Sequence, residues 1–179
     1  MIAGKITGLR AVEENDLEVL KTWRNNQDFR RNFREVRELN SYNQKCWFEK
    51  TCLSPNDFMF VIVRLEDSLP IGACGLLYTN WILRSSDLSF YIGHENAYID
   101  DKGFAEEACQ LLLEYGFGNL NLNKVWMELY EFDQKKLDFF TGKFNFKKDG
   151  KLRENCYEDG RYWDSYILSL LRKEHKGRV

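Results

Sequence analysis

The stretch YIDDKGFAEEACQLLLEYGF, residues 98–117, predicts a helix whose first turn is unusual. Its apolar residues recur every three or four positions along one face, as in an amphipathic helix; they are Phe104, Ala108, Leu111, Leu112 and Tyr115. The start of the stretch carries Gly103 and Ala105 after two aspartates. Glycine inside a helix costs roughly 1 kcal/mol relative to alanine, so its presence here calls for a physical reason.

One such reason is the binding of an anion. The first turn of a helix leaves amide groups unpaired at the positive end of the helix dipole, which favours phosphates. Small residues at positions 103 and 105 let a ligand approach these amides closely. The alternative is an ordinary helix start, in which Gly103 is a loop residue and Asp101 is the N-cap.

Two predicted strands flank this helix, which we expect over about residues 102–118. They are SDLSFYIGH, residues 86–94, and NKVWMELYEF, residues 123–132. A crossover helix between two strands implies that they pair in parallel. Ligands of such sheets bind beyond the carboxyl ends of the strands, so the helix start lies where a phosphate site is expected.

The remaining patterns predict a mixed α/β chain without repeats or linkers, which we interpret as one domain, residues 1–179, ending in a frayed tail at about 172–179. Asn15 or Asp16 is the expected cap of the first helix. Predicted strands cover residues 5–12, 57–65 and 71–82, with two more in 144–171 around the turn at 158–161; predicted helices cover residues 14–25, a segment after Ser41, and 133–144.

Composition excludes several classes of protein. The 179 residues are 44% apolar and 15% aromatic, which suffices for a sizeable core. The formal charge of −2 argues against a nucleic-acid partner. Five cysteines without a CxxC pair or a histidine cluster indicate no metal site and a reducing, cytoplasmic location. No apolar run reaches the length of about 18 residues that a membrane span needs, so we expect no membrane partner.

The segment DDKGFAEEACQLLLEYGF, residues 100–117, resembles the acetyl-CoA loop of the GNAT superfamily of N-acetyltransferases, in particular the branch of the ribosomal-protein N-terminal acetyltransferases. Nearly the whole chain follows that branch in order. The resemblance implies the GNAT fold, α/β (α+β), with a single mixed, mostly antiparallel sheet, a splayed central parallel strand pair and flanking helices. It also implies acetyl-CoA as co-substrate and no metal.

The resemblance further implies which residues bind acetyl-CoA. The pyrophosphate is expected on the amides of residues 101–105, and the pantetheine on the main chain near residues 91 and 92. The implied set is Tyr91, Ile92, Asp101, Lys102, Gly103, Phe104, Ala105, Asp133 and Phe140. The chain departs from the family pattern at three of its positions: Asp100 replaces Gln or Arg, Asp133 replaces Asn, and Phe140 replaces Tyr.

Acetyl transfer to an amine requires a base, because an alkylamine is about 1% neutral or less at pH 7. Asp87 is the first candidate and Glu128 the second, with His94 as a further group that titrates near neutrality. Each carboxylate could instead be a solvated or capping group. Tyr91 and Tyr130 could protonate the leaving thiolate.

The acceptor side is expected near WRNN, residues 23–26, where Trp23, Arg24 and Asn25 are the candidate binding residues. This segment is similar to acetyltransferases of nucleotide-linked amino sugars, and the arginines that follow could hold a diphosphate. Alternatively, they form a solvated helix face paired with Glu35 and Glu38.

The sequence therefore predicts an acetyl-CoA-dependent N-acetyltransferase. It is expected to act in a ternary complex on a primary amine: a protein N-terminus, an amino-sugar nucleotide or another small amine. The alternative is a catalytically weak or inactive acyl-CoA-binding module. We expect a monomer or a homodimer.

Overall fold

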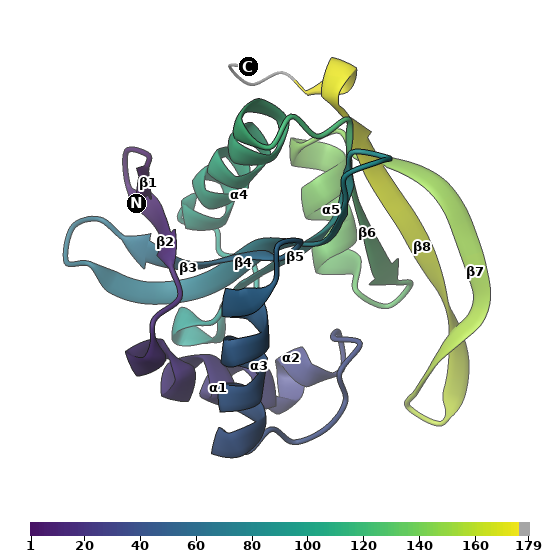
Figure 1. The fold of residues 1–179 in the computed structure, drawn as a ribbon. Coiled ribbons are helices and arrows are strands. Elements are labelled where there is room, and N and C mark those ends of the chain that lie inside the picture. The colour runs from purple at the N-terminus through teal and green to yellow at the C-terminus, as the bar shows by residue number, and fades with distance from the viewer. Residues whose placement is uncertain (176–179) are drawn as a thin grey trace.

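The computed structural model describes residues 1–175 and contains one mixed sheet of eight strands, in the order β1-β2-β3-β4-β5-β6-β8-β7 (Figure 1). All neighbouring strands are antiparallel except β5 and β6. The strands are β1 (Ile2–Ala3), β2 (Thr7–Ala11), β3 (Phe58–Arg64), β4 (Leu69–Asn80), β5 (Ser85–Ile92), β6 (Lys124–Tyr130), β7 (Lys147–Glu158) and β8 (Arg161–Leu171).

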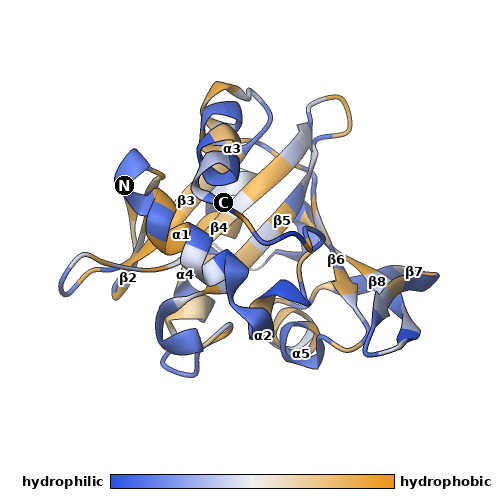
Figure 2. Cartoon of the chain, turned by 90° about the horizontal axis from the view of Figure 1, so that it is seen from below, coloured by the Kyte–Doolittle hydropathy of each residue, from blue (hydrophilic) through white to orange (hydrophobic). Residues whose placement is uncertain are grey.

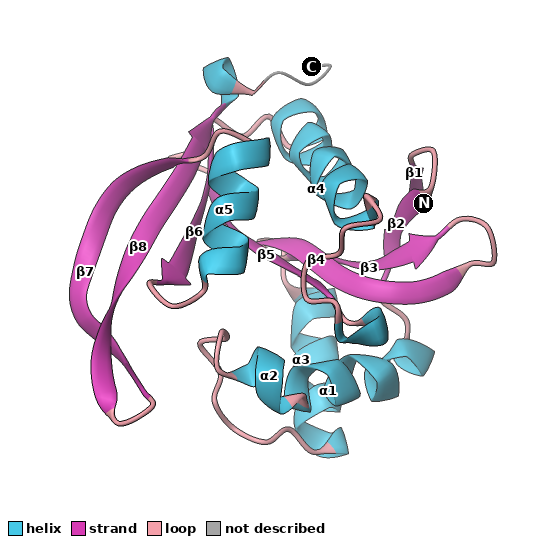
Figure 3. Cartoon of the chain, turned by 180° about the vertical axis from the view of Figure 1, so that it is seen from behind, coloured by secondary structure: helices cyan, strands magenta, loops and turns pink. Residues whose placement is uncertain are grey.

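Helices cover both faces of the sheet. One face carries α4 (Phe104–Glu114) and α5 (Gln134–Lys143), and the other carries α1 (Leu17–Asn25), α2 (Gln27–Arg30) and α3 (Ser41–Leu53) (Figure 3). Apolar segments of β3 and β4 lie against the second group of helices, as Figure 2 shows from below. None of the helices in residues 1–175 is long and apolar enough to cross a membrane.

The parallel pair is short. Only three residues of each strand are in register, Ser85 to Asp87 opposite Lys124 to Trp126. Beyond them β5 pairs with β4 alone, whereas β6 pairs with β8 as far as Tyr130. The predicted splayed pair of parallel strands is thus confirmed, and it leaves a gap in the sheet where backbone groups of both strands lack a neighbouring strand.

Side chains of β5 alternate between the two faces, as in any strand. Phe90 points toward α5, where its ring lies 6.2 Å from that of Phe139. Tyr91 points the other way, toward Trp23 of α1 and Phe33 of the loop after α2. Residues 88–91 of β5 line the cavity described below.

The structure refines several predicted boundaries. The helix expected from residue 102 to 118 begins at Phe104, and a π-helical turn (Tyr115–Asn119) follows its α-helical part. Asp16 is the N-cap of α1, as one of the two predicted alternatives, but its side chain bonds to no amide of that helix. Its Oδ2 instead accepts a hydrogen bond at 2.8 Å from the amide of Glu13, which caps a short turn (Glu14–Asp16) before α1. β1 and α2 were not predicted; both are too short to give a periodic pattern.

At the end of the chain, residues 172–174 form a single 3-10 turn. The rest of the predicted tail, residues 176–179, lies outside the described residues.

Candidate active site

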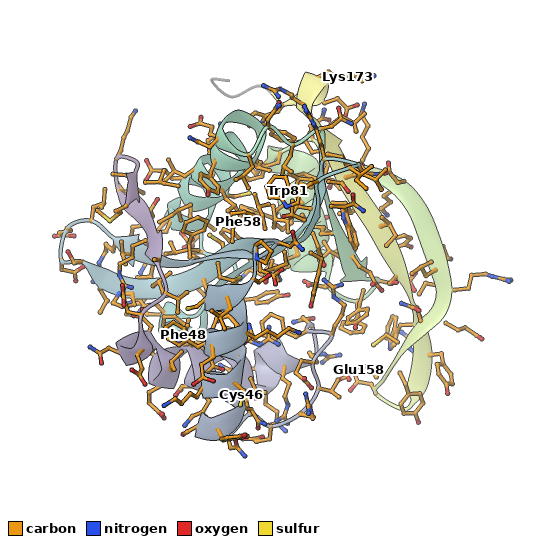
Figure 4. The ribbon with its side chains drawn as sticks, viewed as in Figure 1. Cys46, Phe48, Phe58, Trp81, Glu158 and Lys173 are labelled. Atoms are coloured by element: carbon orange, nitrogen blue, oxygen red, sulfur yellow. The ribbon has the colours of Figure 1, made fainter. Side chains whose placement is uncertain are left out.

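A cavity of about 540 Å³ lies where β5 and β6 separate. Side chains from both strands line it on the sheet side, and α1, α3 and the loop of residues 31–39 close it on the other. Cys46, labelled on α3 in Figure 4, is one of the lining residues. A volume of this size is typical of sites for small molecules.

Glu128 and Glu35 are the acidic residues that line this cavity, and Glu35 is paired with Arg37. Glu128 lies on β6, and its Oε1 accepts hydrogen bonds from Ser165 Oγ at 2.7 Å and from Asn155 Nδ2 at 2.6 Å. Its Oε2 accepts no hydrogen bond from any of residues 1–175. The two donors fix the orientation of the side chain, which leaves one carboxylate oxygen for a ligand.

Asp87, the first candidate base, lies behind Arg34 and does not line the cavity. Its buried carboxylate forms an ion pair with Arg34 through Oδ2. Oδ1 is also buried and has no hydrogen-bond partner among the described residues. Burial raises the pKa of Asp87, and the neighbouring Arg34 opposes this rise.

Three tyrosines line the cavity: Tyr78 from β4, Tyr91 from β5 and Tyr130 from β6. The last two lie on the separating strands. Burial raises the pKa of each of these two phenols to about 12. Both hydroxyls therefore remain protonated at neutral pH and can donate a hydrogen bond. His94, in contrast, lies in a turn outside the cavity, with Nε2 3.7 Å from Glu95 Oε1.

Two cations meet at the ring of Phe33. The Arg24 guanidinium carbon lies 4.0 Å from the ring centroid, and Lys136 Nζ lies 5.5 Å from it. All three residues line the cavity. Burial lowers the pKa of Arg24, and it lowers that of Lys136 to about 8. Neither side chain has a carboxylate within 4.0 Å among residues 1–175.

Of the three predicted acceptor residues, only Arg24 lines the cavity. Trp23 is buried against Gly93, where a Cβ atom would stand 2.1 Å from the indole. Asn25 exchanges two hydrogen bonds with the main chain of Leu39, at 2.7 and 2.8 Å. Trp23 thus belongs to the core, and Asn25 fastens the loop that closes the cavity.

At the start of α4, Gly103 is the N-cap and has a left-handed conformation, with φ of 92°. This backbone conformation favours glycine irrespective of any ligand. The Asp100 carboxylate accepts hydrogen bonds from the amides of Phe104 at 3.0 Å and Ala105 at 2.6 Å. The expected phosphate-binding amides therefore already hold a carboxylate, and it comes from Asp100 instead of Asp101, which is exposed.

Main-chain groups on β5 show a similar internal pairing. The N–H and C=O of Ile92 bond to the C=O and N–H of Tyr98, at 2.9 and 2.8 Å. Tyr91 is in register with Ala73 of β4, and Gly93 donates to Ile71 of the same strand. Because bonded positions alternate along an antiparallel ladder, the main chain of Tyr91 faces β4 and that of Phe90 faces the gap.

The other residues of the implied acetyl-CoA set have internal partners too. The Tyr98 hydroxyl donates to Asp133 Oδ2 at 2.6 Å, and Asp133 also caps α5. Phe140 is fully buried among the rings of Phe90, Phe139, Phe144 and Phe146. Lys102 is exposed and pairs with Glu95 at 2.7 Å.

Comparison with known proteins agrees with this architecture. The family model described as "Acetyltransferase (GNAT) domain" matches residues 7–137. The chain belongs to the GNAT acetyltransferases. Like its relatives, this GNAT protein is an acetyl-CoA-dependent enzyme that acetylates amino groups.

Among its relatives is spermidine N(1)-acetyltransferase of Vibrio cholerae, which is 26% identical over 95% of both chains. The crystal structure of that enzyme with CoA and spermine superposes with a TM-score of 0.85 at 25% identity and covers 94% of this chain and 96% of the other. The N-acetyltransferase p20 of Bacillus licheniformis is 31% identical over 66% of this chain and 64% of its own length. YdaF of Bacillus subtilis, named as a candidate ribosomal N-acetyltransferase, is 27% identical over 63% of this chain and 60% of its own.

The sequence pattern did not indicate four residues of this site. Ser165 and Asn155 orient Glu128, Lys136 points into the cavity, and Tyr98 holds Asp133. Lys136 did leave a weak signal, because it occupies a buried position of α5. A lysine is almost never fully buried unless it has a partner.

Proposed function

We propose that a small primary amine binds in the cavity beside Glu128 and that this carboxylate removes its proton, directly or through a water molecule. One observation carries the proposal: Ser165 and Asn155 hold Oε1 of Glu128 and leave Oε2 without a partner, at the gap between β5 and β6. A base that is oriented in this way needs no rearrangement before it acts. Asp87 is the weaker candidate because Arg34 stands between it and the cavity.

In this reaction the amine nitrogen forms a bond to the acetyl carbon, and the carbon–sulfur bond of the thioester breaks with its electron pair on sulfur. One proton leaves the ammonium group for Glu128 before the attack. A second leaves the nitrogen as the amide forms and ends on the thiolate. Tyr130 and Tyr91, with a pKa of about 12, are weaker acids than a thiol with a pKa of about 8.5. We infer that they donate a hydrogen bond to sulfur and do not lose their proton.

For acetyl-CoA, we propose that the pyrophosphate binds at residues 101–105, with the pantetheine along the gap next to the main chain of Phe90. The absence of a Cβ at Gly103 supports this, since among residues 1–175 only Ile6 comes within 4 Å of the position where that atom would stand. Asp100 must then release the two amides that it occupies. Asp133, the N-cap of α5, and Phe140, within that helix, are buried with internal partners and would have to be uncovered to flank the chain of the pantetheine.

The acceptor that a relative acetylates does not establish the acceptor of this chain. The Vibrio cholerae enzyme is named for spermidine, so a polyamine is one small amine to test. The alternative is an acyl-CoA-binding module with little activity. Asp100 favours that alternative, because its carboxylate holds the amides that the pyrophosphate requires.

The test is release of free thiol from acetyl-CoA with a panel of amines, nucleotide amino sugars and N-terminal peptides. We expect Glu128→Gln to lower kcat by about 10²- to 10⁴-fold, which is the usual contribution of a general base. Glu131→Gln is the matched control, because Glu131 lies just beyond the same strand and does not line the cavity. Saturable CoA binding without thiol release for any acceptor would favour the binding module.

Two further expectations are proposals of the same kind. A monomer or homodimer remains our proposal for the assembly; a related Vibrio cholerae enzyme was crystallised as a dodecamer, and sedimentation velocity distinguishes these states. A reducing, cytoplasmic location is supported by five cysteines without a disulfide.

A further inference from the structure

We propose that the acceptor carries an anionic group, a carboxylate or a phosphate, and that Arg24 and Lys136 bind it while Glu128 receives the amine. This inference rests on the proposed function and deepens it. It assigns a class of acceptor and gives a binding role to Lys136.

The first observation is that neither of these two cations forms an ion pair in the described part of the chain; Glu35 attracts Arg24, and Asp133 attracts Lys136, only from a distance. The other arginines that line the cavity are paired, Arg34 with Asp87 and Arg37 with Glu35. Arg24 and Lys136 have no carboxylate within 4.0 Å in the described part of the chain. The cavity therefore contains positive charge that no contact ion pair among residues 1–175 neutralises.

The second observation is that Lys136 is buried and Arg24 is half-buried. Lys136 is only 6% exposed, and its ammonium group touches the rings of Tyr98, at 4.5 Å, and Phe33. Aromatic rings compensate only a small part of the loss of hydration. Burial is the main cause of the lowered pKa of Lys136; attraction to Asp133 opposes it, and repulsion from Arg24 and Arg34 adds to it. An anion bound between these two cations would offset both their loss of hydration and their mutual repulsion.

The third observation concerns the arrangement of the charges. Glu128 presents a negative group from β6, and Arg24 and Lys136 present positive groups from α1 and α5 into the same cavity. A polyamine has no group for the two cations. The acetyl and pantetheine parts of acetyl-CoA are uncharged, so the donor does not supply an anion in the gap. An acceptor with one amine and one anionic group complements all three side chains.

The experiment compares matched acceptors on the unmodified protein by release of thiol. Suitable pairs are glucosamine with glucosamine 6-phosphate and n-propylamine with 4-aminobutyrate, with spermidine as the polyamine. We expect kcat/KM to be about 10- to 100-fold higher for the anionic member, as charge-assisted hydrogen bonds imply. The two pairs distinguish a phosphate from a carboxylate.

Variants then locate the effect. Arg24→Gln and Lys136→Met should each reduce the anionic preference, the ratio of kcat/KM within a pair, by about tenfold or more, mainly through KM of the acceptor. Lys135→Met is the control, because Lys135 is the adjacent residue of α5 and does not line the cavity. Its anionic preference should equal that of the unmodified protein.

Three results would overturn the inference. The first is a kcat/KM for spermidine or for the amines without an anionic group that equals or exceeds the value for the anionic amines. The second is an unchanged anionic preference in both Arg24→Gln and Lys136→Met. The third is that these variants raise KM for acetyl-CoA and leave KM for the acceptor unchanged. The last result would mean that the cations bind the donor. Failure of the proposed function looks different, because then no acceptor of either kind releases thiol.

Discussion

Arg34 forms an ion pair with Asp87 and so joins the loop that closes the cavity to the middle of strand β5. The Asp87 side chain is 1% exposed and that of Arg34 is 49% exposed. Only one carboxylate oxygen of Asp87 is compensated, since Oδ1 has no partner within residues 1–175. The stability of this region therefore depends on a single cation that approaches from the solvent side.

Removal of this cation should destabilise the protein. We expect Arg34→Met to lower the free energy of unfolding by about 2 kcal/mol at pH 7, because it leaves a charge buried without a partner. Urea denaturation of Arg34→Met, Asp87→Asn and the double variant measures the coupling. The double variant should be more stable than Arg34→Met alone.

The pH dependence of this variant follows from the sign of the shift. The pKa of Asp87 is raised in the folded state, so the folded chain loses stability as the pH rises from the unfolded pKa of about 4. Loss of Arg34 should enlarge this decrease. Arg37→Met is the control, since Arg37 is exposed to solvent and its partner Glu35 is partly so, and its effect on the free energy of unfolding should be much smaller than that of Arg34→Met. If Arg34→Met and Arg37→Met lowered the free energy of unfolding equally, the buried pair of Arg34 and Asp87 would have no special role in stability.

Asp100 should oppose the binding of CoA while it stabilises α4. Asp100→Ala removes two hydrogen bonds at the helix start, which should cost about 1 kcal/mol of stability. The same change frees two amides and removes a negative charge, so the affinity for CoA should rise about fivefold, which corresponds to roughly 1 kcal/mol. Thermal unfolding and calorimetric titration with CoA measure the two effects separately.

Asp101→Ala is the matched control for Asp100→Ala, because Asp101 is exposed and caps no amide in the described structure. Asp101→Ala should change neither the stability of the protein nor its affinity for CoA by a comparable amount. A decrease in CoA affinity in Asp100→Ala would show that Asp100 shapes the loop for CoA and does not compete with it.

Lys136 should reduce stability in the absence of an acceptor. Burial lowers its pKa from 10.5 to about 8, so the charged form is disfavoured in the folded state by at most about 3 kcal/mol. We expect Lys136→Met to stabilise the protein at pH 7 by up to this amount, with a rise in Tm of about 2–4 °C per kcal/mol.

The gain from Lys136→Met should depend on pH in a defined direction. Because the folded pKa lies below the unfolded pKa, the unmodified chain gains stability as the pH rises from about 8 to 10.5. The advantage of the variant should shrink over the same range. Lys135→Met should show no such trend. A variant that is less stable than the unmodified chain at pH 7 would mean that the ammonium group has a stabilising partner.

Much of the fold was accessible from local patterns. The helix at residues 104–114, the strands on each side of it and the two hairpins follow from residue spacing and turn composition. The splayed parallel pair came from the family resemblance and is confirmed. Short elements such as α2 were missed because four residues give no periodic signal.

The candidate site was less accessible. Both carboxylates of the predicted catalytic set are on the expected strands, yet only Glu128 reaches the cavity. Trp23 was expected on the acceptor side and is a core residue, because the adjacent Gly93 admits its ring. Such outcomes depend on how α1 and the loop after α2 pack on the sheet, and no local pattern contains that information.

The sequence by itself determined the order of the elements and the glycine at the start of α4, because these depend on interactions among residues a few positions apart. Only the tertiary structure decided which charges meet. Packing of α1, α5 and the closing loop brings Arg24 and Lys136 to the same Phe33 ring and leaves them without a carboxylate. It also gives Glu128 its two hydrogen-bond donors from β7 and β8. The physical reason is that burial and counter-charge are set by neighbours distant in the chain, and these two quantities define the site.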